Sequence, residues 1–247
     1  MVTWVPLESN PEVMNKVWYS FNFKQYEMIK FYFLYQLGVP EDWGMFDIYG
    51  FGAEELAMVP KPVISVIMLF PFNDAYENRR LEEESFIEKK GQNVSENIYY
   101  LKQYIHNACG TIALIHSVAN NRDKIQLKDG ILKQFLDNGK DMSPSSRGEL
   151  LLKAEDFSNA HKESAFDGQT AAPDPADAVP YHFVSFVCKD GYLYELDGRK
   201  FEPINHGPST PKTLLEDTVN VVQEKFVAPE SGNIHFTLLA LSNCSED

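Results

Sequence analysis

The chain has 247 residues, of which 44% are hydrophobic and 23% charged, so it can bury a core and is neither a disordered nor a fibrous protein. Its 36 acidic residues outnumber 22 basic ones, and the net charge of −14 without a basic patch argues against nucleic acid as a partner. A basic protein partner suits this charge better. The odd, sparse set of three cysteines indicates a reducing compartment rather than a disulfide scaffold.

The start of the sequence and its longest apolar run argue against export and against a membrane span. No basic region followed by an apolar one begins the chain, so no signal peptide is evident. The most apolar run, residues 63–72, is interrupted by Pro71 and is too short to cross a bilayer. We expect a monomer in the cytoplasm, with the nucleus as a second location, and no membrane partner.

Strands and helices are mixed along the chain without a regular alternation, which favours one α+β domain over residues 1–247. Val63–Phe70 has a continuous apolar sequence, typical of a strand buried on both faces. Asp74 with Glu77 resembles a capping box at the start of a helix that Gly91 ends. The other expected elements are helices within 103–119, at 131–136, from Ser143-Pro144 and from Thr210-Pro211, a hairpin over 183–196 and a closing strand over 234–241.

Two segments do not fit these elements. Residues 164–181 are rich in small residues and proline and predict a long exposed loop, a feature that is usually functional or disordered. Residues 17–33 contain eight aromatic side chains. That segment is either a helix with an apolar face or an insertion without a burial partner, and in the second case an aggregation hazard.

Cys109 is the first candidate for chemistry. It lies at or near the start of the helix expected within 103–119, where the helix dipole and unpaired N–H groups favour a thiolate. Gly110 beside it would leave room for a substrate backbone. The alternative is a buried structural cysteine, which is the commoner role of this residue.

A cysteine nucleophile needs a base, and His182 is best placed, at the start of a strand after the long loop. His116 lies along the predicted helix at about 10 Å from Cys109, too far to take its proton. His161, in a predicted helix, has nothing to single it out. The chain also offers two oxyanion donors, the backbone N–H of Cys109 and the side-chain amide of Gln103, although by spacing alone a surface glutamine is the commoner reading.

The predicted hairpin tests whether His182 has an orienting partner. If Asp190-Gly191 is a two-residue turn, His182 and Asp197 lie on one face as diagonal neighbours, where a carboxylate can orient an imidazole. A slip of one residue would put them on opposite faces. Taken alone, Asp197 before Gly198 is a turn residue.

Together these residues resemble the ubiquitin C-terminal hydrolase family of cysteine peptidases. The resemblance covers nearly the whole chain and is expected to make it a short member with the catalytic domain alone. Four stretches carry it: residues 4–12 resemble the N-terminal segment of the family, 103–111 its nucleophile motif, 181–183 its histidine motif and 193–200 its aspartate motif.

The resemblance implies a role for each candidate. Cys109 would be the nucleophile, His182 the general base and then acid, Asp197 the orienting carboxylate and Gln103 a donor in the oxyanion hole. The implied reaction is deubiquitination: hydrolysis of small adducts or short peptide extensions from the C-terminal glycine of ubiquitin, through a thioester. Ubiquitin and ubiquitin-like proteins are the implied partners, and no metal or cofactor is expected.

The resemblance also implies a fold. We expect a papain-like core with a mostly antiparallel sheet between helical layers, a knotted backbone, and a crossover loop at 164–181 that passes over the active site. The implied ubiquitin-binding residues are Trp4, Val5, Pro6 and Leu7 of the N-terminal segment and Gly168, Gln169 and Thr170 of the loop.

Residues 17–33 depart from the family, in which the flanking sequences run almost directly into one another. They are either an inserted segment or an unspliced intron. Two alternatives to the hydrolase stay open: a catalytically impaired protein that binds and buffers free ubiquitin, and a papain-like peptidase with another substrate. The complete set of four catalytic residues favours the hydrolase.

Overall fold

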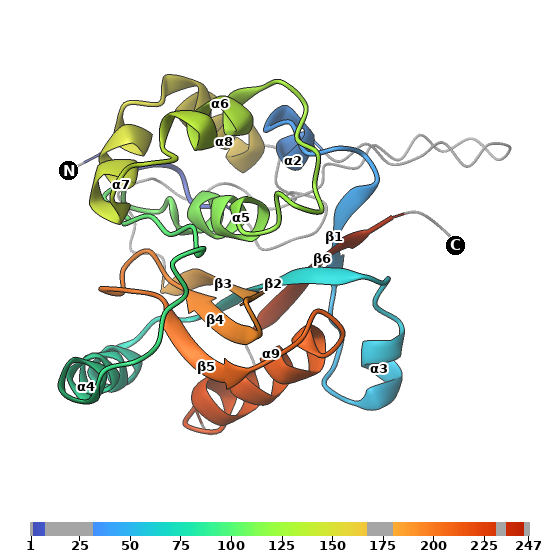
Figure 1. Ribbon diagram of the computed structural model, residues 1–247, viewed down its shortest axis with the longest axis vertical. Helices are drawn as coiled ribbons and strands as arrows, with labels where there is room; N and C mark the ends of the chain where they lie inside the picture. The colour runs from blue at the N-terminus through green and yellow to red at the C-terminus, as the bar shows by residue number, and fades with distance from the viewer. Residues whose placement is uncertain (1, 8–31, 167–179, 231–235, 245–247) are drawn as a thin grey trace, which may run out of the picture.

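The computed structural model describes residues 2–7, 32–166, 180–230 and 236–244 (Figure 1). Its strands form a six-stranded sheet in the order β1-β6-β2-β3-β4-β5, in which all neighbouring pairs are antiparallel. The strands are β1 (Trp43–Asp47), β2 (Val63–Pro71), β3 (Tyr181–Lys189), β4 (Tyr192–Leu196), β5 (Ile204–Pro208) and β6 (Thr237–Asn243).

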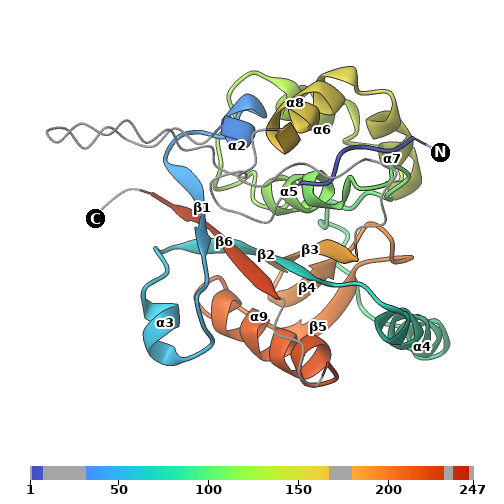
Figure 2. The same ribbon diagram turned by 180° about the vertical axis from the view of Figure 1, so that it is seen from behind.

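Helices cover both faces of this sheet (Figures 1 and 2). One layer consists of α2 (Tyr32–Gln36), α5 (Cys109–Ala119), α6 (Ile131–Asn138), α7 (Pro144–Leu152) and α8 (Glu155–Phe166). The other contains α3 (Ala53–Ala57), α9 (Leu214–Val222) and the π-helical turn η1 (Gln223–Val227), with α4 (Asp74–Lys90) at the periphery on the same side. The expected α+β fold with an antiparallel sheet between helical layers is confirmed. Within the described ranges, no helix combines the length and apolar character needed to cross a membrane.

Strand β2 shows why the sheet is covered on both sides. Its side chains alternate between faces, so that Ile67 joins the hydrophobic cluster around α5 while Val66 and Met68 join the cluster around α9. All three are fully buried. The continuous apolar sequence therefore reflects two cores, one on each face, as the sequence predicted.

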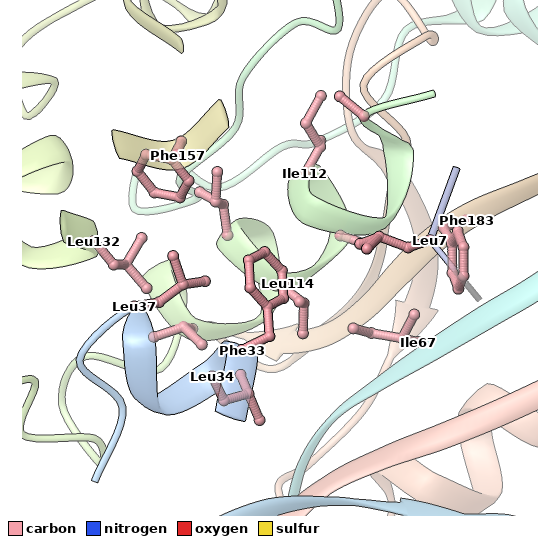
Figure 3. Close-up of a cluster of buried hydrophobic side chains, with 14 of the residues drawn as sticks. Leu7, Phe33, Leu34, Leu37, Ile67, Ile112, Leu114, Leu132, Phe157 and Phe183 are labelled. Atoms are coloured by element: carbon pink, nitrogen blue, oxygen red, sulfur yellow. The ribbon is translucent and has the colours of Figure 1, made fainter. Parts of the chain in front are cut away.

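Helix α5 is the centre of the larger core. Its residues from Cys109 to Val118 are all buried, so it is apolar nearly all round rather than amphipathic. Figure 3 shows Leu114 of α5 beside Phe33 and Leu34 of α2, with Phe157 of α8 close by. These contacts hold α5 against the sheet and so fix the position of its first residue, Cys109.

Two predicted helix starts are shifted in the structure. Asn73, and not Asp74, caps α4, because the Asn73 side chain accepts a 2.8 Å hydrogen bond from the Tyr76 N–H. Asp74 is the first residue of the helix, where its charge still suits the positive end of the dipole. Helix α9 begins at Leu214 rather than at Thr210, since the Thr210 and Thr213 hydroxyls bond one another in a turn before it.

Other boundaries follow the sequence more closely. Ser143 caps α7 and Pro144 occupies its first turn, and Gly91 ends α4 with a positive φ of 75°. The helix expected at 131–136 is α6. The closing strand begins at Thr237, later than the predicted residue 234, and extends to Asn243.

The predicted loop and the aromatic segment lie largely outside the described residues, at 167–179 and up to residue 31. Helix α8 continues to Phe166, so the first three residues of the expected loop are helical. Phe33, at the end of the aromatic segment, is 0% exposed in the α5 core. This part of the segment therefore has a burial partner, against the expectation for an insertion without one.

Replacing Phe33 with alanine should lower the free energy of unfolding by about 3–5 kcal/mol, because the substitution removes a fully buried ring and leaves a cavity. The control is Phe86→Ala on α4, whose ring is 60% exposed and should cost less than about 0.5 kcal/mol. Urea unfolding of both variants measures the difference in the free energy of unfolding as a shift of the midpoint, with the m-value unchanged. Equal midpoints for the two variants would show that the α2 contact contributes nothing to stability.

Candidate active site

The hairpin formed by β3 and β4 has the predicted register. Asp190 and Gly191 both have positive φ, 48° and 83°, as the type I′ turn of a two-residue hairpin loop requires. Pairing runs from Lys189 opposite Tyr192 to Ser185 opposite Leu196, in constant register. The turn thus sets which residues share a face at the far end of the hairpin.

At that far end, His182 and Asp197 meet. The Nε2 atom of His182 lies 2.7 Å from Oδ1 of Asp197, and both side chains are fully buried. The predicted diagonal contact is confirmed, and Asp197 is more than a turn residue. Because a carboxylate only accepts, Nε2 carries the proton of this bond.

The backbone after Asp197 is held by several donors. The N–H of Arg199 donates to Oδ1 of Asp197 at 2.9 Å, and the N–H of Lys200 donates to its carbonyl oxygen at 2.9 Å. The Tyr100 hydroxyl lies within 2.5 Å and 2.7 Å of the Asp197 and Lys200 carbonyl oxygens. This turn therefore holds the Asp197 carboxylate in position.

Each member of the pair stabilises the charge of the other. Burial alone would raise the pKa of Asp197, but the His182 charge and hydrogen bond hold it well below its usual range. Burial alone would lower the pKa of His182, yet the charge and hydrogen bond of Asp197 raise it to about 9. An imidazolium beside a carboxylate is thus the favoured state at neutral pH.

Cys109 is the first residue of α5, as predicted, and its thiol is buried. Burial raises the pKa of Cys109, but the neighbouring His182 imidazolium outweighs burial, so the pKa is lowered overall. The Nδ1 atom of His182 is buried and has no hydrogen-bond partner among the described residues. One ring nitrogen thus binds Asp197, and the other is left for the thiol.

Gln103 is brought to the Asp197 turn. Its backbone N–H donates to the Gly198 carbonyl oxygen at 2.9 Å, and a methyl group on Gly198 would lie only 3.0 Å from the Gln103 Cβ. One N–H of its side-chain amide donates to the Ile105 carbonyl oxygen at 2.9 Å. The amide has a second N–H. Helix geometry also leaves the N–H of Cys109 without an intrahelical acceptor. The role of these two groups as oxyanion donors stays a prediction.

The expectation that Gly110 leaves room for a substrate backbone is wrong. A methyl group there would lie 3.1 Å from Cδ1 of Leu7 and 3.4 Å from the Phe183 ring, so the space is filled by the protein's own core rather than kept for a substrate backbone. Figure 3 shows Leu7 and Phe183 side by side near the start of α5. Glycine is needed here for close packing of the N-terminal segment.

The N-terminal segment is also more buried than its expected role implies. Trp4, Val5 and Leu7 are each less than 9% exposed and belong to the α5 core. Of the four residues of this segment that are expected to bind ubiquitin, only Pro6 is partly exposed. Three of these side chains thus pack in the interior, whereas Pro6 is partly exposed and Val2 and Thr3 are exposed. The role of the segment in binding ubiquitin stays a prediction. Gly168, Gln169 and Thr170 lie outside the described residues.

A buried ion pair beside the Asp197 turn was not recognised from the sequence. The Lys200 ammonium lies 2.7 Å from Glu195 and 2.8 Å from Glu83, and Lys200 is only 2% exposed. Burial lowers the pKa of Lys200, but these carboxylates raise it well above its ordinary value. The signal in the sequence is the set of charged residues Glu195, Asp197 and Lys200 at and just after the end of an otherwise apolar strand.

The arrangement can perform acyl transfer. A thiolate at a helix N-terminus attacks a carbonyl carbon, the neighbouring imidazolium supplies a proton to the leaving group, and N–H donors stabilise the oxyanion. Among the described residues no cluster of side chains suits a metal ion. The fold and the site together define a thiol-dependent hydrolase.

Comparison with known proteins narrows this class to one family. The sequence model for ubiquitin carboxyl-terminal hydrolase, family 1, matches residues 4–227, and the chain belongs to this family. It is 45% identical to a probable ubiquitin carboxyl-terminal hydrolase of Dictyostelium discoideum, over 96% of this chain and 87% of that protein. It is 42% identical to ubiquitin carboxyl-terminal hydrolase isozyme L1 of Homo sapiens, over 96% of both chains.

A solved structure supports the fold. The catalytic domain of Trichinella spiralis UCH37, bound to ubiquitin vinyl methyl ester, superposes with a TM-score of 0.73 over 99% of this chain and 97% of that one. The two sequences are 21% identical, so this likeness concerns the fold. It agrees with the papain-like core expected from the sequence.

Iodoacetamide at pH 7 should alkylate Cys109 before the other two cysteines. Burial raises the pKa of Cys188, and burial with the nearby Asp42 charge raises the pKa of Cys244 to about 11, so neither provides much thiolate. His182→Ala removes the largest influence that lowers the pKa of Cys109, so alkylation of Cys109 should slow about tenfold or more. Peptide mass mapping over time measures each rate, and near-ultraviolet circular dichroism checks folding. An unchanged Cys109 rate in the folded variant would contradict the thiol–imidazole coupling.

Proposed function

We propose that the protein hydrolyses bonds to the C-terminal glycine of ubiquitin, with Cys109 as the nucleophile. The observation that carries this proposal is the buried His182–Asp197 hydrogen bond beside a thiol of lowered pKa, in a chain of this family. The net charge of −14 favours encounter with the basic C-terminal tail of ubiquitin.

The proposed reaction has two acyl transfers. The Cys109 thiolate attacks the glycine carbonyl carbon, and the oxyanion is stabilised by the Cys109 N–H and the Gln103 amide. As the carbon–nitrogen bond breaks, His182 gives its proton to the departing amine, and a thioester remains on Cys109. His182 then takes a proton from water, which attacks the thioester and releases the ubiquitin carboxylate and the thiolate. Asp197 holds the ring in one orientation throughout.

Small adducts and short peptide extensions are the leaving groups that we propose. The chain that joins α8 to β3 returns at Tyr181, one residue before His182. His182 and Cys109 are both buried, so a bulky leaving group would have little space beside the reacting atoms. Ala108 and Cys109, at the start of α5, belong to the α5 core.

The alternative of a catalytically impaired ubiquitin binder is less well supported. A binder needs neither a buried imidazole–carboxylate pair nor a thiol of lowered pKa, and the described site has both. We therefore favour the hydrolase over the binder, and over a peptidase for another substrate because of the family relationship.

Ubiquitin carrying a thiol-reactive vinyl group at its C-terminus should form one adduct with the protein and none with Cys109→Ala, because only Cys109 has a thiol of lowered pKa. Intact mass measures the adduct. The matched control is Cys188→Ala, which removes another buried thiol and should react like the wild type. A folded wild-type protein that binds ubiquitin without forming the adduct would instead support the binder.

Asp197→Asn should move the alkaline limb of kcat/KM to lower pH and lower the maximal rate. The proton donor is the His182 imidazolium, so wild-type activity falls as pH rises through the raised pKa of about 9. Without the Asp197 charge that pKa falls, and the proton is lost at lower pH. Hydrolysis of a fluorogenic ubiquitin amide between pH 5 and 10 measures the profile. The control is the exposed Asp156→Asn on α8, and coincident alkaline limbs for the two variants would contradict the role of Asp197.

A further inference from the structure

His161 is a buried histidine that the proposed reaction does not use. It lies on the apolar face of α8, where Phe157, Ala160 and Ser164 share its helical spacing. The residue is 1% exposed, so no partner can reach its ring from outside. A polar ring at such a position needs hydrogen bonds within the protein.

Both ring nitrogens of His161 have partners on other segments. Nε2 lies 2.5 Å from the Val5 carbonyl oxygen, and because a carbonyl only accepts, Nε2 carries the proton. Nδ1 lies 2.7 Å from the Thr111 hydroxyl and therefore accepts its proton in the neutral ring. One imidazole thus joins the N-terminal segment to a residue two positions after Cys109.

The surroundings of the ring keep it neutral and in place. Its centroid lies 4.6 Å from that of the Trp4 ring system and 6.5 Å from that of Phe33. Burial lowers the pKa of His161 to about 4, so the tautomer that makes both hydrogen bonds persists at neutral pH.

The N-terminal segment also holds the residues just before Cys109. The Trp4 N–H donates to the His106 carbonyl oxygen, and the His106 N–H donates to that of Val2, both at 3.0 Å. The Asn107 amide donates to the Trp4 carbonyl oxygen at 3.1 Å. Asn107 has a positive φ of 62°, a conformation that asparagine tolerates better than most residues. Figure 2 shows the segment passing beside the start of α5.

We propose that His161 is a positioning residue for Cys109: by joining Val5 to Thr111, it fixes the N-terminal segment against the first turn of α5 and thereby aligns the thiol with His182. Its ring touches neither the substrate nor the reacting atoms. The inference extends the proposed function, since it concerns the same nucleophile, but it does not require that ubiquitin be the substrate.

Substitutions at Thr111 separate the hydrogen bond from packing. Thr111→Val keeps the shape of the side chain and removes the donor to His161, whereas Thr111→Ser keeps the donor. His161→Phe keeps a ring beside Trp4 and removes both hydrogen bonds. The matched control is Thr218→Val on α9, a fully buried threonine whose hydroxyl has no hydrogen-bond partner.

The first measurement is the rate of Cys109 alkylation by iodoacetamide at pH 7, which needs no ubiquitin. The second is kcat/KM for a fluorogenic ubiquitin amide. We expect Thr111→Val and His161→Phe each to lower both rates roughly tenfold, the size of a buried hydrogen bond. Thr111→Ser should keep wild-type rates, as should Thr218→Val. The double variant Thr111→Val/His161→Phe should be no slower than His161→Phe, because both changes break one connection.

If folded Thr111→Val is alkylated at Cys109 at the wild-type rate, the proposal is overturned and His161 is only a packing residue. Thr111→Val gives this test even if His161→Phe does not fold. A loss in Thr111→Ser equal to that in Thr111→Val would also overturn it, because the hydroxyl would then not be the cause. If the wild type fails to hydrolyse the ubiquitin amide while the alkylation differences hold, the proposed substrate is wrong and the positioning role stands.

Discussion

The buried hydrogen bond between His182 and Asp197 is the constraint on which the site depends. Two groups that would each lose their charge in an apolar interior keep it because they lie 2.7 Å apart. That separation requires the β3–β4 hairpin to pair without a slip, which in turn requires the left-handed turn at Asp190-Gly191. The positive imidazole then favours the thiolate form of Cys109, so a turn at one end of the hairpin controls chemistry at the other.

The second half of the site depends on packing rather than charge. Cys109 is the first residue of a helix buried on all sides, and its position is set by the layers around α5. Glycine appears where these parts come closest, at Gly110 against Leu7 and at Gly198 against Gln103. The two motifs that carry the nucleophile and the carboxylate are therefore locked together through backbone contacts, not only through the catalytic side chains.

The parts of the fold and site that the sequence predicted well are those set by local rules. A two-residue turn fixes register, so the His182–Asp197 contact followed from counting, and a continuous apolar sequence identified β2 and α5. The errors arose where two residues compete for one role, as Asn73 and Asp74 do at the cap of α4. They also arose where tertiary contacts decide the outcome. No spacing rule shows that Trp4, Val5 and Leu7 fill the core. No spacing rule shows either that His161 bonds both Val5 and Thr111, which are 106 positions apart in the sequence.

The strand order has a consequence for how the protein folds during synthesis and how it unfolds under force. Strand β6, the last described strand along the chain, lies between β1 and β2 and pairs with both. During synthesis the sheet stays divided until this strand has left the ribosome, so the active-site hairpin and β1 are joined only after translation of Thr237–Asn243. Removal of β6 from the sheet by a force applied to the chain beyond it would require both of its hydrogen-bonded ladders to break.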